Sequence, residues 1–175
     1  KAVLFKKFAN IDCFDIEVKE NNPQKLAEIV ASLEPTFGAI NLEDIKAPDC
    51  FEVERLCKEK MKIPVFHDDQ HGTAIVVGAA AVNAIELSQR KIESTKIVAV
   101  GAGASGIACL EMLVKLGAKK ENIWLCDSKG LITKNRSEIN EEKKRFAQNS
   151  QFSKLEDVIE NCDLFLGLSG PGVLT

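Results

Sequence analysis

The chain has 175 residues, of which 45% are hydrophobic and 28% are charged, and its formal net charge is −3. This composition is ordinary for a globular protein with an apolar core, so it excludes a disordered chain and a basic nucleic-acid-binding protein. No apolar run approaches the roughly 20 residues of a membrane span, and we therefore expect a cytoplasmic protein without a membrane partner.

The first half of the chain predicts short strands alternating with helices. Residues 2–8 and 14–18 are rich in Val, Phe and Ile, which favours extended segments. Asn22 followed by Pro23 is typical of a helix start, and Pro35 ends that helix. The next predicted elements are a strand at 39–42, a helix from Pro48 to Met61, a strand at 63–66 and a helix at 73–87 that is apolar on nearly all sides and therefore expected to be buried.

The second half begins after a polar stretch at 88–95 and alternates strands with helices. Such alternation is typical of a parallel sheet with right-handed crossovers. The sequence thus predicts an α/β fold, with a Rossmann-like parallel sheet covered by helices on both faces in residues 91–175, preceded in residues 1–90 by part of another α/β domain. The predicted elements are strands at 97–100, 123–127 and 163–168, helices at 104–116 and 155–161, and a charged helical region at 137–149.

A glycine-rich loop joins the strand at 97–100 to the next helix. Its glycines permit a tight turn, close approach of a pyrophosphate and close helix packing, and the anion would lie at the helix N-terminus. Asp127 ends the next strand, about 20 residues later, where an acid accepts hydrogen bonds from the adenosine ribose. Together these features favour a dinucleotide site over a purely structural turn. The loop residues are Gly101, Ala102, Gly103, Ala104, Ser105 and Gly106.

The residues around Asp127 leave the choice of dinucleotide open. Its charge favours NAD, because a carboxylate repels the 2′-phosphate of NADP. Ser128 and Lys129 follow directly, and a hydroxyl and an ammonium group there would hold that phosphate. The sequence therefore predicts NAD or NADP without deciding between them.

Two pairs of carboxylates follow neighbouring strands. Glu43 and Asp44 come after one strand and Asp68 and Asp69 after the next, so a parallel arrangement brings all four to the same sheet edge. Clustered carboxylates suit Mg²⁺ or Mn²⁺. Adjacent strand residues point to opposite faces, so residues 42–45 must form a turn if Glu43 and Asp44 share one ion. The alternative is that Asp44 and Asp69 cap helices while the others are solvated.

Both histidines flank the second pair of carboxylates. His67 and His71 have the spacing of the zinc-protease motif His-Glu-x-x-His. That motif needs Glu in second place and a continuous helix, whereas here Asp68 is second and Gly72 follows the motif. We therefore expect the histidines to hydrogen-bond the carboxylates rather than to bind zinc.

Three segments at 3–9, 40–48 and 64–74 resemble bacterial-type malic enzymes, and the glycine loop and residues 164–169 fit the same family. The segments read Val-Leu-Phe-Lys-Lys-Phe-Ala, Ile-Asn-Leu-Glu-Asp-Ile-Lys-Ala-Pro and Pro-Val-Phe-His-Asp-Asp-Gln-His-Gly-Thr-Ala. The resemblance covers essentially the whole chain. It implies oxidative decarboxylation of L-malate to pyruvate and CO₂, reduction of NAD or NADP, a bound Mg²⁺ or Mn²⁺, and a homodimer.

The resemblance also assigns roles to residues of this chain. It implies that Lys1 is the general base, with a pKa that must be lowered for this role, and that Asp68 orients it. Ser169, at the end of the last matching segment, joins the loop, Asp127 and Ser128 as part of the cofactor site. The implied metal ligands are Glu43, Asp44 and Asp69.

The chain has no tyrosine, although the family uses one to protonate the enol. In the family that tyrosine lies upstream of this segment, and the asparagines that contact substrate lie downstream. We therefore expect a piece of a longer enzyme, cut within the dinucleotide-binding domain, that does not form a complete active site alone.

Two other functions remain open. A non-catalytic module that senses NAD(P) would bind dinucleotide without metal-dependent turnover. A related amino- or hydroxy-acid dehydrogenase would transfer hydride without a metal and would leave the four carboxylates without a role.

Overall fold

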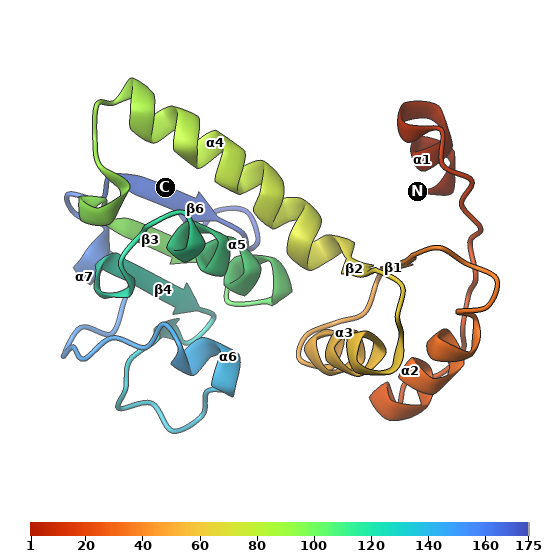
Figure 1. The fold of residues 1–175 in the computed structure, drawn as a ribbon. Coiled ribbons are helices and arrows are strands. Elements are labelled where there is room, and N and C mark those ends of the chain that lie inside the picture. Colours follow the sequence, from red (N-terminus) through yellow and green to blue (C-terminus); the bar gives the residue numbers. More distant parts are fainter. Residues whose placement is uncertain (175) are drawn as a thin grey trace.

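The computed structural model describes residues 1–174, which contain a two-stranded and a four-stranded sheet (Figure 1). In the first sheet, β1 (Ile40–Leu42) lies parallel to β2 (Val65–His67), with Leu42 opposite His67. The second sheet has the order β5-β4-β3-β6, in which β3 is parallel to both β4 and β6, and β5 is antiparallel to β4. Its strands are β3 (Ile97–Val100), β4 (Ile123–Asp127), β5 (Gly130–Leu131) and β6 (Leu164–Gly167).

The helices divide between two lobes joined by a long connecting helix. The first lobe, residues 1–67, contains α1 (Ala2–Ala9), α2 (Pro23–Ser32) and α3 (Asp49–Lys60). The second lobe, residues 92–174, contains α5 (Ala104–Lys115), α6 (Glu141–Lys144), α7 (Glu156–Ile159) and the short 3₁₀ turns η2 (Ile92–Ser94) and η3 (Lys120–Asn122). Between them lie the π-helical turn η1 (Asp68–Gly72) and α4 (Thr73–Leu87).

The α/β fold with helices on both faces of a mainly parallel sheet is confirmed. Alternate residues of the fully buried strand β3 point to opposite faces of the sheet. Ile97 and Ala99 pack with the apolar side of α5, whereas Val98 and Val100 pack with Val158 of α7. Both faces of the strand are therefore covered, as expected for a buried parallel strand.

The strand order reverses direction at the carboxyl end of β3. The chain leaves β3 towards β4 on one side, while β6 lies on the other, which makes this edge a topological switch point. The segment after β6 stays beside it, because the Leu168 N–H donates to the Val100 carbonyl at 2.8 Å. The glycine loop thus begins at the position where α/β sheets bind ligands.

In the first lobe, α2 and α3 pack around the two short strands. The Asn22 side chain accepts a hydrogen bond from the Lys25 N–H at 3.0 Å, which caps α2 as the sequence predicts. The shared core is apolar and closes one side of the β1–β2 pair. Its buried members are Ala27, Val30, Leu42, Val53, Cys57, Met61 and Val65.

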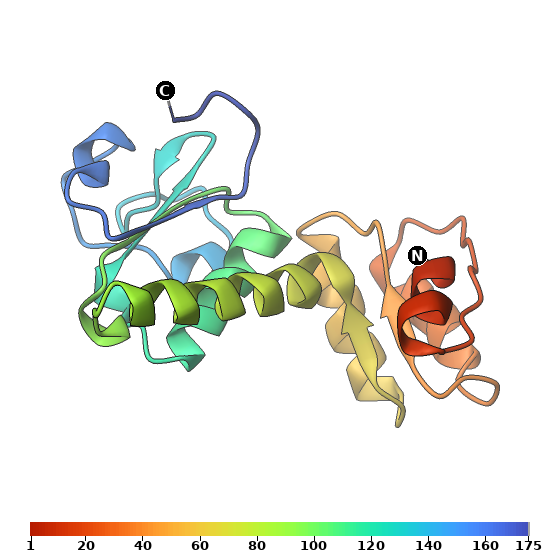
Figure 2. The same cartoon turned by 90° about the horizontal axis from the view of Figure 1, so that it is seen from above.

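Helix α4 has the predicted bounds, but the prediction that it is buried is wrong. It runs from the end of β2 along the second lobe (Figures 1 and 2) and packs closely on α5, where a side-chain carbon at Gly78 would lie 2.9 Å from Met112 Cγ. Its opposite side is exposed, with Val76 69% and Leu87 85% accessible. An all-apolar helix needs two partners to be buried, and the described residues supply one.

Of three further predictions, those for residues 2–8 and 137–149 are wrong. Residues 2–8 form α1 rather than a strand, because Leu4, Phe5 and Phe8 recur at helical spacing and Asn10 ends the helix in a left-handed conformation. Residues 14–18 form neither helix nor strand. The charged region 137–149 contains only the short helix α6, so most of it is loop.

The six cysteines are all free. Among the helices of residues 1–174, none combines the length and apolar composition that a bilayer crossing requires.

Candidate functional site

Three carboxylates meet at the edge of the two-stranded sheet. Because Leu42 and His67 are the last paired residues of β1 and β2, the side chains that follow both strands emerge together. One oxygen from each of Glu43, Asp68 and Asp69 lies within 4.8 Å of the others. Such crowding of negative charge, and the hard oxygen donors themselves, fit Mg²⁺ or Mn²⁺.

Asp44 does not join this cluster. β1 ends at Leu42, so the chain turns where the prediction requires a turn. Asp44 then adopts a left-handed conformation with φ of 57° and is exposed, whereas Asp68 takes the third place beside Glu43 and Asp69. The sequence could not show this, because the direction of a side chain depends on the backbone torsion within the turn.

Lys1, at the start of α1, reaches the same cluster. Its Nζ lies 2.5 Å from Asp68 Oδ2 and 3.4 Å from Glu43 Oε1. The hydrogen bond to Asp68 raises the pKa of Lys1 above its usual value, which is the opposite of the lowered pKa that a base requires. In this arrangement Lys1 is therefore a cation that partly neutralises the carboxylates.

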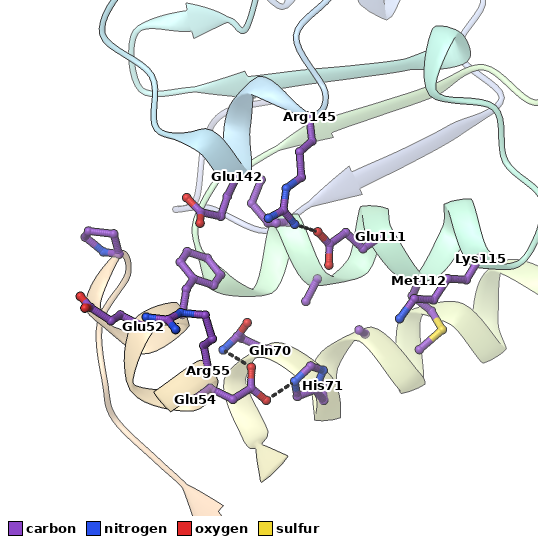
Figure 3. Close-up of a pocket in the computed structure, with 15 residues that line it drawn as sticks. Glu52, Glu54, Arg55, Gln70, His71, Glu111, Met112, Lys115, Glu142 and Arg145 are labelled. Atoms are coloured by element: carbon purple, nitrogen blue, oxygen red, sulfur yellow. Dashed lines mark hydrogen bonds and ion pairs between the residues drawn. The ribbon is translucent and has the colours of Figure 1, made fainter. Parts of the chain in front are cut away.

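The two histidines have different surroundings, and neither bonds to the four predicted carboxylates. His67 is fully buried, and neither ring nitrogen has a hydrogen-bond partner within residues 1–174. His71 Nε2 lies 2.5 Å from Oε1 of Glu54, a buried residue of α3 (Figure 3). The expectation for these histidines is therefore wrong, and no group of metal-ligating side chains in the described part of the chain contains either of them.

Glu54 is a residue that the sequence analysis missed. It also accepts hydrogen bonds from Lys58 at 2.6 Å and from Gln70 at 3.3 Å. It lines a cavity of about 530 Å³ between α3, α5 and α6, and this cavity contains none of the predicted site residues (Figure 3). A single Glu within a helix of alternating charged and apolar residues gives no signal of burial.

The glycine loop has the shape that a dinucleotide site requires. Gly101 has a φ of 112°, and a side-chain carbon there would overlap the Leu168 carbonyl. A carbon at Gly106 would overlap the main-chain oxygen of Gly101, so the helix begins in direct contact with the preceding strand. Gly103 is exposed and has nothing within 4 Å of an added carbon, which leaves free space in front of the helix N-terminus.

The remaining predicted cofactor residues lie around this opening. Ala102 lies in the loop and Ala104 begins α5. Ser169 is exposed, and its main-chain nitrogen lies beside Gly101 at the switch point. Ser105, the second residue of α5, donates its hydroxyl to the main-chain carbonyl of Asp69 at 2.7 Å. The glycine loop and the carboxylate cluster are thus in direct contact.

Asp127 ends β4 as predicted, but its carboxylate is already fully bonded. Arg136 donates to both oxygens, at 2.9 and 3.1 Å, and Lys143 donates to Oδ2 at 2.8 Å. Burial alone would raise the pKa of Asp127, but these hydrogen bonds outweigh it and lower the pKa to about 2. Lys129, which was expected with Ser128 to hold a 2′-phosphate, bonds Glu138 through its side chain, and Ser128 is exposed.

We expect Asp127→Asn to lower the free energy of unfolding by about 3 kcal/mol at pH 7, because it leaves Arg136 and Lys143 without a counter-charge. The folded-state pKa of about 2 lies below the ordinary 3.8, so the carboxylate stabilises the fold above pH 4 and loses this effect as the pH falls towards 2. The difference between the two proteins should therefore shrink over that range. Urea unfolding followed by the fluorescence of Trp124 measures it.

Glu138→Gln is the matched control, because Glu138 is an exposed carboxylate that bonds Lys129 in the same region. We expect no measurable change in stability from this variant. Equal stability of Asp127→Asn and the unmodified chain at pH 7 would contradict the assigned role of the ion pairs.

Comparison with known proteins places this geometry in context. Residues 70–174 match the family model described as "Malic enzyme, NAD binding domain". The NADP-dependent malic enzyme of Haemophilus influenzae is 56% identical over 177 residues, covering 100% of this chain and 23% of that protein. The NAD-dependent malic enzyme of Rhizobium meliloti is 58% identical over 175 residues, covering 99% of this chain and 23% of that protein.

Solved structures agree with these matches. The crystal structure of the NAD-dependent malic enzyme from Thermotoga maritima superposes with a TM-score of 0.93 at 44% identity, covering 99% of this chain and 47% of that one. The malic enzyme of Entamoeba histolytica gives a TM-score of 0.88 at 36% identity, covering 99% of this chain and 39% of that one. The chain thus spans about a quarter of the length of the two curated relatives and less than half of these solved chains.

Proposed function

The chain belongs to the malic enzyme family, and on that premise we propose that its parent protein oxidises and decarboxylates L-malate to pyruvate and CO₂ while reducing NAD or NADP. The observation that supports this most is the contact between the carboxylate cluster and the glycine loop, through Ser105 and Asp69. A reaction that passes a hydride from a metal-bound hydroxy acid to nicotinamide requires those two sites to be neighbours.

We propose that Glu43 and Asp69 hold a divalent cation. Asp44, the remaining predicted ligand, lies outside their cluster in this structure and would join it only if the turn after β1 changed its conformation. When bound, Mg²⁺ or Mn²⁺ supplies Lewis-acid polarisation of the substrate hydroxyl and stabilises the enolate left by loss of CO₂. The carboxylates supply hard oxygen donors and a negative field, and the turn after β1 and β2 holds them at one edge.

Lys1 is proposed to take the proton from the C2 hydroxyl of malate. Asp68 holds its ammonium group at 2.5 Å and thereby fixes its direction. Because the pKa of Lys1 is raised by Asp68, deprotonation requires an opposing positive charge, and a divalent cation among the same carboxylates supplies one.

The dinucleotide is proposed to place its pyrophosphate over Gly103 and the first N–H groups of α5. Around Asp127, two cations face one carboxylate, so the site has a net positive charge that Arg136 and Lys143 provide. This charge accommodates the 2′-phosphate of NADP despite Asp127, and we therefore propose that NADP is accepted as well as NAD.

The wider organisation follows the same premise. We propose that residues 1–90 belong to the catalytic domain and residues 91–175 to the NAD(P)-binding domain. We also propose that the whole enzyme is a cytoplasmic homodimer.

The test is reduction of NAD⁺ and NADP⁺, in parallel, by the full-length protein with L-malate and Mn²⁺. We expect turnover that chelator abolishes and that added Mn²⁺ restores. Asp69→Asn should lower kcat/KM by about 100-fold or more, because it removes a charged metal ligand. Asp12→Asn, at an exposed carboxylate paired with Lys6, is the control and should leave turnover unchanged.

Two results would contradict the proposal. Binding of dinucleotide without any turnover of malate would favour the sensing module. Oxidation of malate that survives chelator and releases no CO₂ would favour a metal-independent dehydrogenase.

A further inference from the structure

The hydroxyl of Ser105 lies between the two halves of the proposed active site. Ser105 belongs to the glycine-rich loop, and its main chain is part of the first turn of α5. Its Oγ donates to the carbonyl oxygen of Asp69, 2.7 Å away and 36 residues earlier in the chain. The same residue therefore touches the element expected to hold pyrophosphate and the main chain of a proposed metal ligand.

This bond determines what the hydroxyl is free to do. A serine hydroxyl has one proton, and here it is donated to a main-chain oxygen. The hydroxyl therefore cannot also donate to a phosphate oxygen. It cannot accept a hydrogen bond from a phosphate oxygen either, because that oxygen carries no proton at neutral pH. The Ser105 side chain thus acts on the Asp69 segment, while its main chain remains available to the dinucleotide.

The turn η1 is held from two sides. On the side of the first lobe, Gln70 and His71 bond the buried carboxylate of Glu54. Among residues 1–174, the bond from Ser105 to Asp69 is the only side-chain hydrogen bond between the second lobe and η1, since the others come from the first lobe. Removal of the Ser105 hydroxyl therefore leaves η1 hydrogen-bonded to the first lobe but no longer to the glycine loop.

We propose that Ser105 is a positioning residue that couples binding of the divalent metal to binding of the dinucleotide. The proposal rests on the proposed function, since it needs both ligands. A dinucleotide that fixes the N-terminus of α5 also fixes the Asp69 carbonyl, and with it the Asp69 carboxylate. Conversely, a metal that fixes Asp69 also fixes the N-terminus of α5 for the dinucleotide. The factor by which the metal changes dinucleotide affinity must equal the factor by which the dinucleotide changes metal affinity.

The experiment measures this coupling in the full-length protein. Free Mn²⁺ is followed by electron paramagnetic resonance in titrations with and without saturating NADPH, and NADPH fluorescence is titrated with and without saturating Mn²⁺. We expect each ligand to tighten the other in the unmodified protein. In Ser105→Ala we expect the factor by which each ligand tightens binding of the other to fall by about threefold to tenfold, the effect of one lost hydrogen bond.

Two further variants separate coupling from general damage. Ser88→Ala removes a hydroxyl that bonds the Ile85 carbonyl at the far end of α4, and it should leave the coupling unchanged. Ser105→Thr keeps a hydroxyl and should restore the coupling.

The possible outcomes separate failure of the proposed function from failure of the proposed coupling. A protein that binds neither Mn²⁺ nor NADPH would overturn the proposed function together with this inference. Binding of both ligands without coupling, or full coupling in Ser105→Ala, would overturn the inference alone. Loss of coupling in Ser105→Thr as complete as in Ser105→Ala would also overturn it, because the effect would then not depend on the hydroxyl.

Discussion

Replacement of Lys1 by alanine in the full-length protein should lower kcat for malate by about 100-fold to 10,000-fold, the usual contribution of a positioned general base. Affinity for Mn²⁺ should stay the same or increase, because the variant removes a cation that lies 3.4 Å from Glu43 Oε1. Steady-state turnover and a Mn²⁺ titration on the same preparation measure the two effects separately. Low kcat with intact metal binding is the pattern expected of a base.

Two other lysine variants sharpen this test. Lys6 lies on the same helix and forms an exposed ion pair with Asp12. Lys6→Ala removes this pair and should leave kcat unchanged. Lys1→Arg keeps the positive charge but cannot lose its proton at neutral pH, and it should be nearly as inactive as Lys1→Ala. If Lys1→Ala kept kcat within about threefold of the unmodified protein, the role of Lys1 as base would be wrong.

Two glycines of the same loop should respond oppositely to alanine. Gly103→Ala should change the free energy of unfolding by less than about 0.5 kcal/mol, because the added carbon meets nothing within 4 Å. The same carbon occupies the space proposed for the pyrophosphate, and we expect the Kd for NADPH to rise about 100-fold, equivalent to the loss of two hydrogen bonds to charged oxygens. Urea unfolding and NADPH fluorescence measure the two quantities.

Gly106→Ala should damage the fold itself. Its added carbon overlaps the Gly101 main-chain oxygen, which cannot move without separating α5 from β3. We expect a loss of about 3 kcal/mol in the free energy of unfolding. Gly38→Ala, whose added carbon also meets nothing within 4 Å but lies in the first lobe, should alter neither stability nor binding.

Tight NADPH binding by Gly103→Ala would show that the loop is only a structural turn.

The second lobe was largely predictable from sequence because its local signals agree with its tertiary structure. The strands at 97–100 and 123–127 are apolar and bounded by turns, and α5 begins where the glycine loop ends. The parallel pairing of β1 and β2 was predictable for the same reason, and it placed Glu43 beside Asp68 and Asp69. In each case a short sequence pattern determines both the element and its neighbour.

The predictions that were wrong depend on contacts between distant residues. Arg136 and Lys143 pair with Asp127 across a loop whose path has no sequence signature. The apolar composition of α4 indicates burial, although the described residues cover only one side of it. The error at α1 is local instead, because an apolar pattern of so few residues fits both a strand and a helix.

The irregular turn η1 has a mechanical consequence. It is the one break between strand β2 and the straight, fifteen-residue rod of α4, which packs along the second lobe. A rod of this kind resists bending, so a rotation between the lobes is expected to be taken up in the five residues of the turn, where π-helical geometry is least regular. Asp68 and Asp69 stand at that hinge. A rotation between the lobes at this turn would therefore change the distances within the carboxylate cluster itself.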